Sequence, residues 1–292
     1  MSFELHPNGL PFSRNEIPPW QTGGARAAIL SGMVPIALTV AGSDPSGGAG
    51  IQADLKTFHQ FGVYGEAAIT LLTVQNTVGV SRVQVMEPQL VTEQLEAILS
   101  DIPPHAAKTG ALGSAEVVAA VARVMAKWDF PLVVDPVMVS KHGAPLLPED
   151  AVKMICDELI PCATLITPNV PEAEVLCSLE IRSLKDMKLA AAILRGMGAK
   201  AVLIKGGHLE GDAVDLLYSD ETFHHFPAAR IDTKHTHGTG CTFSAAITAS
   251  LASGLSMVDA VARAKRFIQE AIRTNPGLGS GTGPVNHHAE VR

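Results

Sequence analysis

Short uninterrupted runs of apolar residues, separated by segments with helical periodicity, are the feature that most constrains this chain. The clearest runs are IALTVAG (36–42), PLVVD (131–135), ATLIT (163–167) and AVLIK (201–205). Apolar runs without alternation are typical of strands buried on both faces, as in a parallel sheet covered by helices. The sequence therefore predicts a three-layer α/β fold, with a mostly parallel central sheet and helices on both faces.

The segments between these runs repeat apolar residues every three or four positions, as the buried face of a helix does. The sets are Ile51, Leu55 and Phe58; Val91, Leu95, Ile98 and Ile102; Val118, Val121 and Met125; and Met257, Val261, Ala264 and Ile268. A weaker stretch, AVDLLYSDETFHHF (213–226), predicts a hairpin at an edge of the sheet. Since no internal repeat or low-complexity linker divides residues 35–292, we predict a single domain there.

Residues 1–34 are predicted to be a flexible N-terminal tail, because proline and glycine interrupt them repeatedly. They lack the charged and apolar regions of a secretory signal, and the apolar stretch 27–42 is too short and broken to span a bilayer. A net charge of −7 lacks the basic footprint of a nucleic-acid binder. Four cysteines without a CxxC pair fit reduced thiols. We therefore expect a cytoplasmic protein that binds neither nucleic acid nor membrane.

Polar residues follow the apolar runs: Asp44 and Asn169 come shortly after two of them, and Asp135 and Lys205 end two others. In open α/β sheets, ligands bind beyond the carboxyl ends of the strands. The alternative is that strand ends become polar simply because the chain meets water there. We expect these four side chains to converge on one site.

A glycine-rich turn links the first run to the first helix, and its G48-A-G50-I-Q-A53 pattern matches the glycines of a dinucleotide-binding turn. That fingerprint also needs a carboxylate at the end of the second strand, whereas Glu66 stands at the start of the next run. The turn is therefore expected to wrap a smaller ligand, which Asp44 and Asp54 could hydrogen-bond. For Asp54, a solvated position on its helix is the alternative.

A second glycine turn, G238-T239-G240-C241, precedes an Ala-rich helix that ends near Gly254. Unpaired N–H groups of a first helical turn, together with the helix dipole, form an anion hole that can stabilise a transferring phosphoryl group. The same dipole predicts a lowered pKa for the Cys241 thiol. The chain contains no GxxxxGK[ST] sequence, which disfavours a phosphate-transfer enzyme of the P-loop type.

Histidines near this turn raise the possibility of a metal site. His235, His237 and Cys241 are close in sequence, but HxHxxxC across a glycine turn lacks the regular spacing of a zinc site. His287 and His288 are expected to belong to a C-terminal tail.

Six segments together resemble the hydroxymethylpyrimidine/phosphomethylpyrimidine kinases of thiamine biosynthesis, which belong to the ribokinase superfamily. They are AGSDPSGGAGIQADLKTF (41–58), VQNT (74–77), DPVM (135–138), TPNVPEAE (167–174), KGGH (205–208) and HGTGCT (237–242). The likeness runs from about residue 35 to 287. It implies a ribokinase-like fold, ATP and Mg²⁺, and phosphorylation of 4-amino-5-hydroxymethyl-2-methylpyrimidine and of its monophosphate. It also implies a homo-oligomer, in the form of a dimer.

The resemblance also assigns roles to residues. Cys241 would activate the substrate hydroxyl, and the anion hole would come from Gly238, Thr239 and Gly240. The substrate would contact Gln75, Gly42, Asp54 and Val137; ATP would contact Lys205 and Asn169; Asp135 and Glu172 would place Mg²⁺. An amide suits the edge of an aminopyrimidine, because it offers a donor and an acceptor. For Glu172, a first-turn carboxylate favoured by the helix dipole is the alternative.

One position departs from the family pattern: the segment KTGAL has Ala111 where methionine is frequent, which implies a roomier pocket. Three other functions are considered. A pyridoxal or pyridoxine kinase shares fold, cofactor and glycine turn; a non-catalytic pyrimidine-binding protein could share the fold; and a nicotinamide enzyme would use the first glycine turn.

Overall fold

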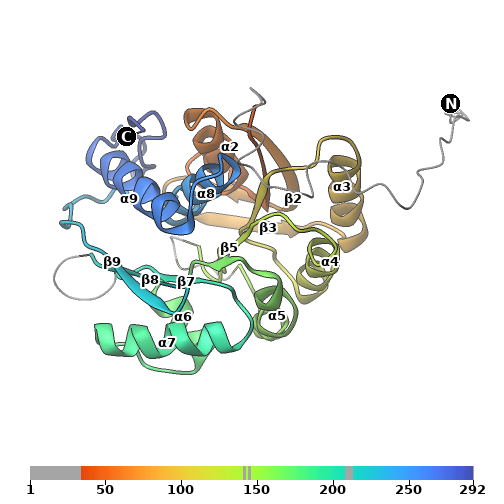
Figure 1. Ribbon diagram of the computed structural model, residues 1–292. Helices are drawn as coiled ribbons and strands as arrows, with labels where there is room; N and C mark the ends of the chain where they lie inside the picture. The colour runs from red at the N-terminus through yellow and green to blue at the C-terminus, as the bar shows by residue number, and fades with distance from the viewer. Residues whose placement is uncertain (1–33, 141–142, 144–145, 208–212, 292) are drawn as a thin grey trace, which may run out of the picture.

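The computed structural model describes residues 34–140, 143, 146–207 and 213–291 (Figure 1). Within this part of the chain one nine-stranded sheet forms, in the order β3-β2-β1-β4-β5-β6-β7-β8-β9. The predicted tail falls almost wholly on residues 1–33, which lie outside the described residues.

The centre of the sheet is parallel, as the unbroken apolar runs predict. β1 (Ile36–Ser43) pairs in parallel with β2 (Tyr64–Gln75) on one side and β4 (Ala106–Thr109) on the other. The parallel pairing continues through β5 (Leu132–Val134), β6 (Leu165–Ile166) and β7 (Val202–Ile204).

Both edges of the sheet are antiparallel. β3 (Val80–Val85) pairs with β2 at one edge. At the other edge, β8 (Asp215–Ser219) and β9 (Thr222–Phe226) form the hairpin expected from residues 213–226.

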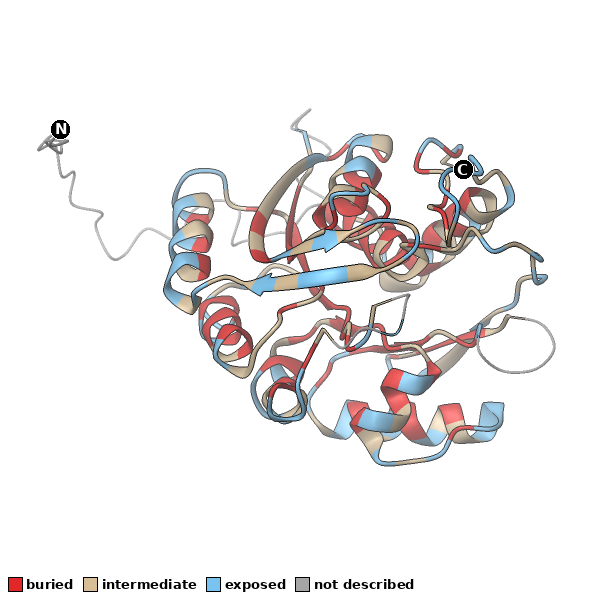
Figure 2. Cartoon of the chain, turned by 180° about the vertical axis from the view of Figure 1, so that it is seen from behind, coloured by how far each residue is buried: buried red, intermediate tan, exposed pale blue. Residues whose placement is uncertain are grey.

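Helices cover both faces of the sheet, which confirms the three-layer prediction (Figure 1). One face carries α2 (Gly50–Gln60), α8 (Thr239–Ala252) and α9 (Met257–Arg273). The other carries α3 (Pro88–Asp101), α4 (Ala115–Met125), α5 (Glu149–Met154), α6 (Val170–Cys177) and α7 (Leu184–Gly196), with short turns at Ile155–Leu159 and Ile160–Cys162. In Figure 2 the helices other than α8 are buried on the sides that face the sheet and more exposed on their outer sides.

Helix α8 lies so close to the sheet that every residue from Thr242 to Ala252 is buried. Its many alanines and serines allow this approach, because small side chains leave little space between the backbones. Two of its buried hydroxyls are satisfied within the helix: Thr248 Oγ1 donates to the Ser244 carbonyl and Ser250 Oγ to the Ala246 carbonyl, both at 2.8 Å. The sequence thus places the glycine turn that begins this helix against the middle of the sheet.

The strand order reverses beside β1, since the chain passes first to β2 and later to β4 on the opposite side. Such a reversal opens a crevice at the carboxyl ends of the strands, where open α/β sheets bind ligands. No helix among the described residues has the length and apolar character needed to cross a membrane.

Candidate active site

A cavity of about 730 Å³ opens at the carboxyl ends of the parallel strands, a volume in the range of small-molecule sites. The predicted site residues that line it are Gly42, Gln75, Asp135, Val137, Asn169, Glu172, Lys205, Gly238, Thr239, Gly240 and Cys241. Of the predicted site residues, Asp54 does not line it. Side chains far apart in the sequence therefore meet at one place, as the polar strand ends suggest.

The first turn of α8 has the geometry expected of an anion hole. Thr239 N–H donates to the Thr236 carbonyl and Thr242 N–H to the Gly238 carbonyl. The N–H groups of Gly240 and Cys241 have no such partner among the described residues and stand at the positive end of the helix dipole. The Thr239 N–H, one of the predicted anion-hole donors, is therefore already hydrogen-bonded within the protein. The Cys241 N–H is available as a donor instead.

Glycine is required at the helix start for a steric reason. Gly238 has a φ of +77°, and a Cβ atom there would collide with the Gly48 carbonyl. The two glycine turns of the sequence therefore cross in direct backbone contact. At Gly240 a Cβ atom would instead point into the cavity, 3.4 Å from Lys205 Nζ.

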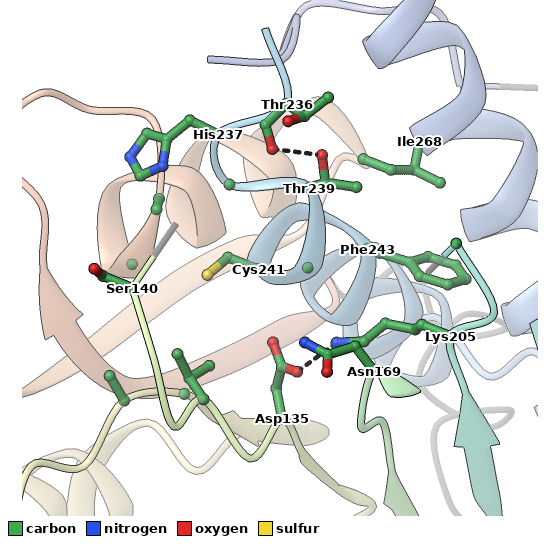
Figure 3. A pocket seen from close by; sticks show the side chains of 18 of the residues that line it. Asp135, Ser140, Asn169, Lys205, Thr236, His237, Thr239, Cys241, Phe243 and Ile268 are labelled. Atoms are coloured by element: carbon green, nitrogen blue, oxygen red, sulfur yellow. Dashed lines mark hydrogen bonds and ion pairs between the residues drawn. The ribbon is translucent and has the colours of Figure 1, made fainter. Parts of the chain in front are cut away.

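Lys205 and Asp135 form an ion pair in front of this turn, with Nζ 2.9 Å from Oδ1 (Figure 3). Asp135 is buried and also accepts hydrogen bonds from Ser244 Oγ, at 3.1 Å, and Thr167 Oγ1, at 3.3 Å. Burial opposes the charge on Lys205, but Asp135 and Glu172 outweigh it and raise the lysine pKa to about 12. A fixed positive charge thus faces the same space as the free N–H groups.

Asn169 and Glu172 close the N-terminus of α6 as a reciprocal capping box. Asn169 Oδ1 accepts from Glu172 N–H at 2.9 Å, and Glu172 Oε2 accepts from Asn169 N–H at 2.8 Å. Glu172 is therefore a first-turn carboxylate that stabilises the start of α6, which is the structural alternative considered from the sequence. It also lines the cavity. Burial, with a smaller contribution from Asp135, raises its pKa to about 7.

This pair of carboxylates bears on the expected Mg²⁺. Asp135 and Glu172 are close enough to disfavour each other's charge, which a divalent cation would relieve. Mg²⁺ in phosphoryl-transfer sites takes only one or two protein carboxylates and completes its shell with phosphate and water. The described residues contain no group of three or more histidine, cysteine, aspartate or glutamate side chains placed to hold a metal ion.

The prediction of a lowered pKa for Cys241 is wrong. Burial raises the pKa of this thiol to about 11, although Lys108 and the Gly50 N–H act in the opposite direction. A helix dipole contributes at most about 2 kcal/mol, or roughly 1.5 pKa units, whereas burial shifts a pKa by up to about 3–5 units. In the free protein Cys241 is therefore a thiol at neutral pH. Figure 3 shows its sulfur pointing into the cavity.

Asp54 also departs from prediction, both as a substrate contact and as a solvated helix residue. It is fully buried, and its Oδ1 lies 2.8 Å from Lys108 Nζ. Its Oδ2 accepts from Thr39 Oγ1 at 2.6 Å. Lys108, rather than Asp54, lines the cavity.

Asp44 was expected to hydrogen-bond a ligand, but its carboxylate is occupied within the protein. It accepts from the N–H groups of Ser46 and Ala49, both at 2.9 Å, and lies 2.8 Å from His237 Nε2. Asp44 therefore shapes the first glycine turn from inside, although it also borders the cavity.

His287 is not a tail residue, contrary to expectation. It is buried behind α8, with Nε2 3.1 Å from Thr242 Oγ1, whereas His288 is exposed. The same segment meets the second glycine turn, since His237 N–H donates to the Gly283 carbonyl at 2.9 Å. The C-terminal segment thus supports the turn that precedes α8.

Several residues that line the cavity were not predicted from the sequence. Lys108 could have been noticed as a charged residue within the apolar strand AAKT, because lysine is rarely buried without a partner. Phe243, Ile268 and Ile272 form an apolar part of the lining, but they follow the ordinary helical pattern of α8 and α9. No local signal separates them from core residues.

Comparison with known proteins gives a consistent result. The sequence model of the family described as phosphomethylpyrimidine kinase matches residues 44–286. The hydroxymethylpyrimidine/phosphomethylpyrimidine kinase of Synechococcus elongatus is 47% identical over 256 residues, covering 87% of this chain and 97% of its own. The thiamine biosynthesis bifunctional protein ThiED of Geobacter sulfurreducens is 51% identical over 252 residues, or 86% of this chain; the alignment spans 51% of that longer protein.

Solved structures share the fold over most of the chain. A phosphomethylpyrimidine kinase from Clostridium difficile 630 has a TM-score of 0.73 at 44% identity, covering 81% of this chain and 99% of its own. The pyridoxal kinase of Staphylococcus aureus in complex with AMP-PCP and pyridoxal has a TM-score of 0.81 at 39% identity, covering 88% and 94%. From the family match and these identities, the chain belongs to the phosphomethylpyrimidine kinase family.

Proposed function

We propose that this protein transfers the γ-phosphoryl group of ATP to the hydroxymethyl group of 4-amino-5-hydroxymethyl-2-methylpyrimidine, and then phosphorylates the monophosphate to the diphosphate. The observation that carries this proposal is one cavity lined both by the free N–H groups of α8, with Lys205, and by Cys241 and Gln75. The relative from Synechococcus elongatus is named a hydroxymethylpyrimidine/phosphomethylpyrimidine kinase, and this name supports the same activity.

The cavity has two chemically different ends that suit the two substrates. Figure 3 shows Cys241 and His237 on one side of the cavity, and Gln75 lies 3.1 Å from His237 Nε2, so a small heterocycle would bind there. Figure 3 shows Phe243 and Ile268 on the opposite side of the cavity, where they form an apolar surface that suits a purine. Between them lie Lys205 and the N-terminus of α8, where the phosphates would be held.

The protein's own contribution to the reaction is mainly positioning and charge. The N–H groups of Gly240 and Cys241 and the ammonium of Lys205 would stabilise the charge on the moving phosphoryl group. Mg²⁺, held near Asp135 and Glu172, would neutralise phosphate charge. Because Cys241 is a thiol at neutral pH, it would first have to release its own proton to solvent; the resulting thiolate would then accept the proton of the substrate hydroxyl as the new P–O bond forms.

A pyridoxal kinase is the second candidate, favoured by Ala111. This small residue lines the cavity, and the extra space there would admit pyridoxal, whose ring carries one substituent more than the hydroxymethylpyrimidine. The solved structures that resemble this chain also include pyridoxal kinases.

The test is a substrate panel with ATP and Mg²⁺, in which mass spectrometry separates mono- and diphosphate products. We expect both products from the hydroxymethylpyrimidine and a lower kcat/KM for pyridoxal. Phosphorylation of pyridoxal alone would overturn the proposal in favour of the second candidate.

Cellular location and assembly belong to the same proposal. All four cysteines are unpaired, which suits a reducing cytoplasm. Light scattering on the purified protein would test the expected dimer.

A further inference from the structure

Gln75 does not act alone at the heterocycle end of the cavity, because its amide contacts a buried histidine. His237 Nε2 lies 2.8 Å from Asp44 Oδ2, and Gln75 Nε2 lies 3.1 Å from the same nitrogen. His237 and Asp44 are each 3% exposed. All three residues line the cavity.

The ring of His237 is held firmly in place. Its backbone N–H donates to the Gly283 carbonyl at 2.9 Å, and its carbonyl accepts from Val285 N–H at 3.3 Å. The ring also lies close to Gly48, where a Cβ atom would collide with Cδ2 of the histidine. Rotation of the ring away from Asp44 is therefore obstructed.

The carboxylate decides which hydrogen the histidine carries. Burial opposes the charge on Asp44, but hydrogen bonds from His237 and Ser46 prevail and lower the pKa of this carboxyl below its ordinary value. An ionised carboxylate 2.8 Å away requires an N–H, since a nitrogen lone pair would repel it. His237 Nε2 is therefore the protonated nitrogen.

The hydrogen on His237 Nε2 in turn decides how the Gln75 amide is oriented. The two arms of a carboxamide have the same shape, and a half turn about χ3 exchanges them. An NH₂ group facing the Nε2–H would set two donors against each other, whereas the oxygen accepts from it. The structure places Gln75 Nε2 toward His237; the half turn brings the oxygen there instead, where it shares the Nε2–H with Asp44, and the NH₂ group then forms the other arm.

We propose that His237, held by Asp44, fixes the donor–acceptor order of the Gln75 amide and thereby selects heterocycles by the polarity of their hydrogen-bonding edge. This proposal rests on the proposed function. A 4-aminopyrimidine presents an amino donor beside a ring-nitrogen acceptor, and its 4-oxo analogue presents an acceptor beside an N–H donor. An amide that cannot turn matches the first edge and opposes the second, whereas a free amide turns to match either.

The experiment compares kcat/KM for 4-amino-5-hydroxymethyl-2-methylpyrimidine and its 4-oxo analogue. We expect the wild type to prefer the 4-amino compound by on the order of 10²-fold, as for a mismatched buried hydrogen-bonding pair. His237→Phe keeps a flat ring but loses the N–H, and it should reduce this preference at least tenfold. His237→Gln restores an N–H toward both neighbours and should keep the preference within about threefold. The exposed His225 provides a control, since H225Q should change neither value.

The preference ratio separates selection from structural support. A purely structural role for His237 would lower both kcat/KM values together and leave the ratio unchanged, which would overturn the proposal. Gln75→Met, at a half-buried position, gives a second measurement that does not depend on the folding of H237F. It should also lose the preference, and an unchanged ratio there would overturn the proposal equally. Turnover of neither pyrimidine by the wild type would instead refute the proposed function itself.

Discussion

Lys108 and Asp54 form an ion pair from which water is excluded: Nζ lies 2.8 Å from Oδ1, and neither side chain is exposed. Burial opposes the charge on Lys108, but Asp54, Cys241 and Asp135 prevail and raise the pKa of the lysine. Lys108 therefore remains charged at neutral pH. It lines the cavity beside Cys241, whose burial otherwise disfavours a thiolate. The pair thus places a permanent cation where a transient sulfur anion would need one.

Removing one partner of this pair should be far more harmful than removing both. Lys108→Met leaves an unpaired buried carboxylate and should cost about 3–5 kcal/mol of stability, whereas D54L/K108M replaces the pair with apolar side chains and should stay near the wild type. Urea unfolding measures both variants. The exposed Lys153–Asp157 pair is the control, and K153A should cost less than about 1 kcal/mol. Equal losses for the single and double variants would contradict this account.

Cys241 should alkylate slowly at neutral pH, because its thiol pKa is raised to about 11. The rate with iodoacetamide should climb with pH well above pH 9, measured at this site by peptide mass spectrometry. In D54L/K108M the rise should shift to still higher pH, because the neighbouring cation is gone. Cys177, whose pKa burial also raises to about 11, provides the internal control, and its profile should not move. Because D54L also removes a carboxylate that raises the thiol pKa, an identical Cys241 profile in both proteins would show that Lys108 does not outweigh Asp54 at this thiol.

Truncation of the thiol tests its part in the reaction. Cys241→Ala should lower kcat by about 10²–10⁴-fold, the usual scale for a positioned proton acceptor. Steady-state kinetics with the pyrimidine and ATP measures the change. An activity within twofold of the wild type would remove Cys241 from the reaction.

The sequence predicts the parts of this molecule that depend on local pattern. Unbroken apolar runs are enough to predict the parallel strands, and glycines at a helix start are enough to predict the turn before α8. The fate of Asp54 could not be predicted in this way, because its partner Lys108 is 54 positions away and helical spacing does not say which sheet position a helix faces. The pKa of Cys241 depends on a balance between dipole and burial that only the surroundings decide. His287 lies in a segment without periodicity, so nothing local indicates that it packs behind α8.

The anion hole can be blocked with a single methyl group. At Gly240 the φ angle is not left-handed and a Cβ atom would meet only Lys205 Nζ at 3.4 Å and Asp135 Oδ2 at 3.8 Å, so G240A should fold normally. The methyl would occupy the space of a phosphate oxygen and should lower kcat/KM for ATP by roughly 10²–10³-fold. Gly196, at the end of α7, is a matched control because a Cβ atom there meets nothing within 4 Å. If G240A and G196A retain equal activity, phosphate does not bind at this turn.

His287 should make the protein sensitive to mild acid. Burial is the main cause that lowers its pKa to about 4, from an ordinary value of 6.5, so the folded protein keeps it neutral. Below pH 6.5 His287 binds a proton in the unfolded chain but stays neutral in the folded chain. Stability therefore falls until the pH reaches about 4. From these two values the loss between pH 7 and pH 5 is about 2 kcal/mol.

The measurement is urea unfolding of the wild type and His287→Gln at pH 7 and pH 5. The variant can still hydrogen-bond Thr242 but cannot be protonated, so it should lose about 2 kcal/mol less than the wild type over this interval. Glu66 and Glu172, whose pKa values burial raises to about 7, respond in the opposite direction, but they are common to both proteins and cancel in the comparison. The exposed His288 serves as the control, and H288Q should follow the wild type. Parallel losses in H287Q and the wild type would mean that His287 accepts a proton without leaving its place behind α8.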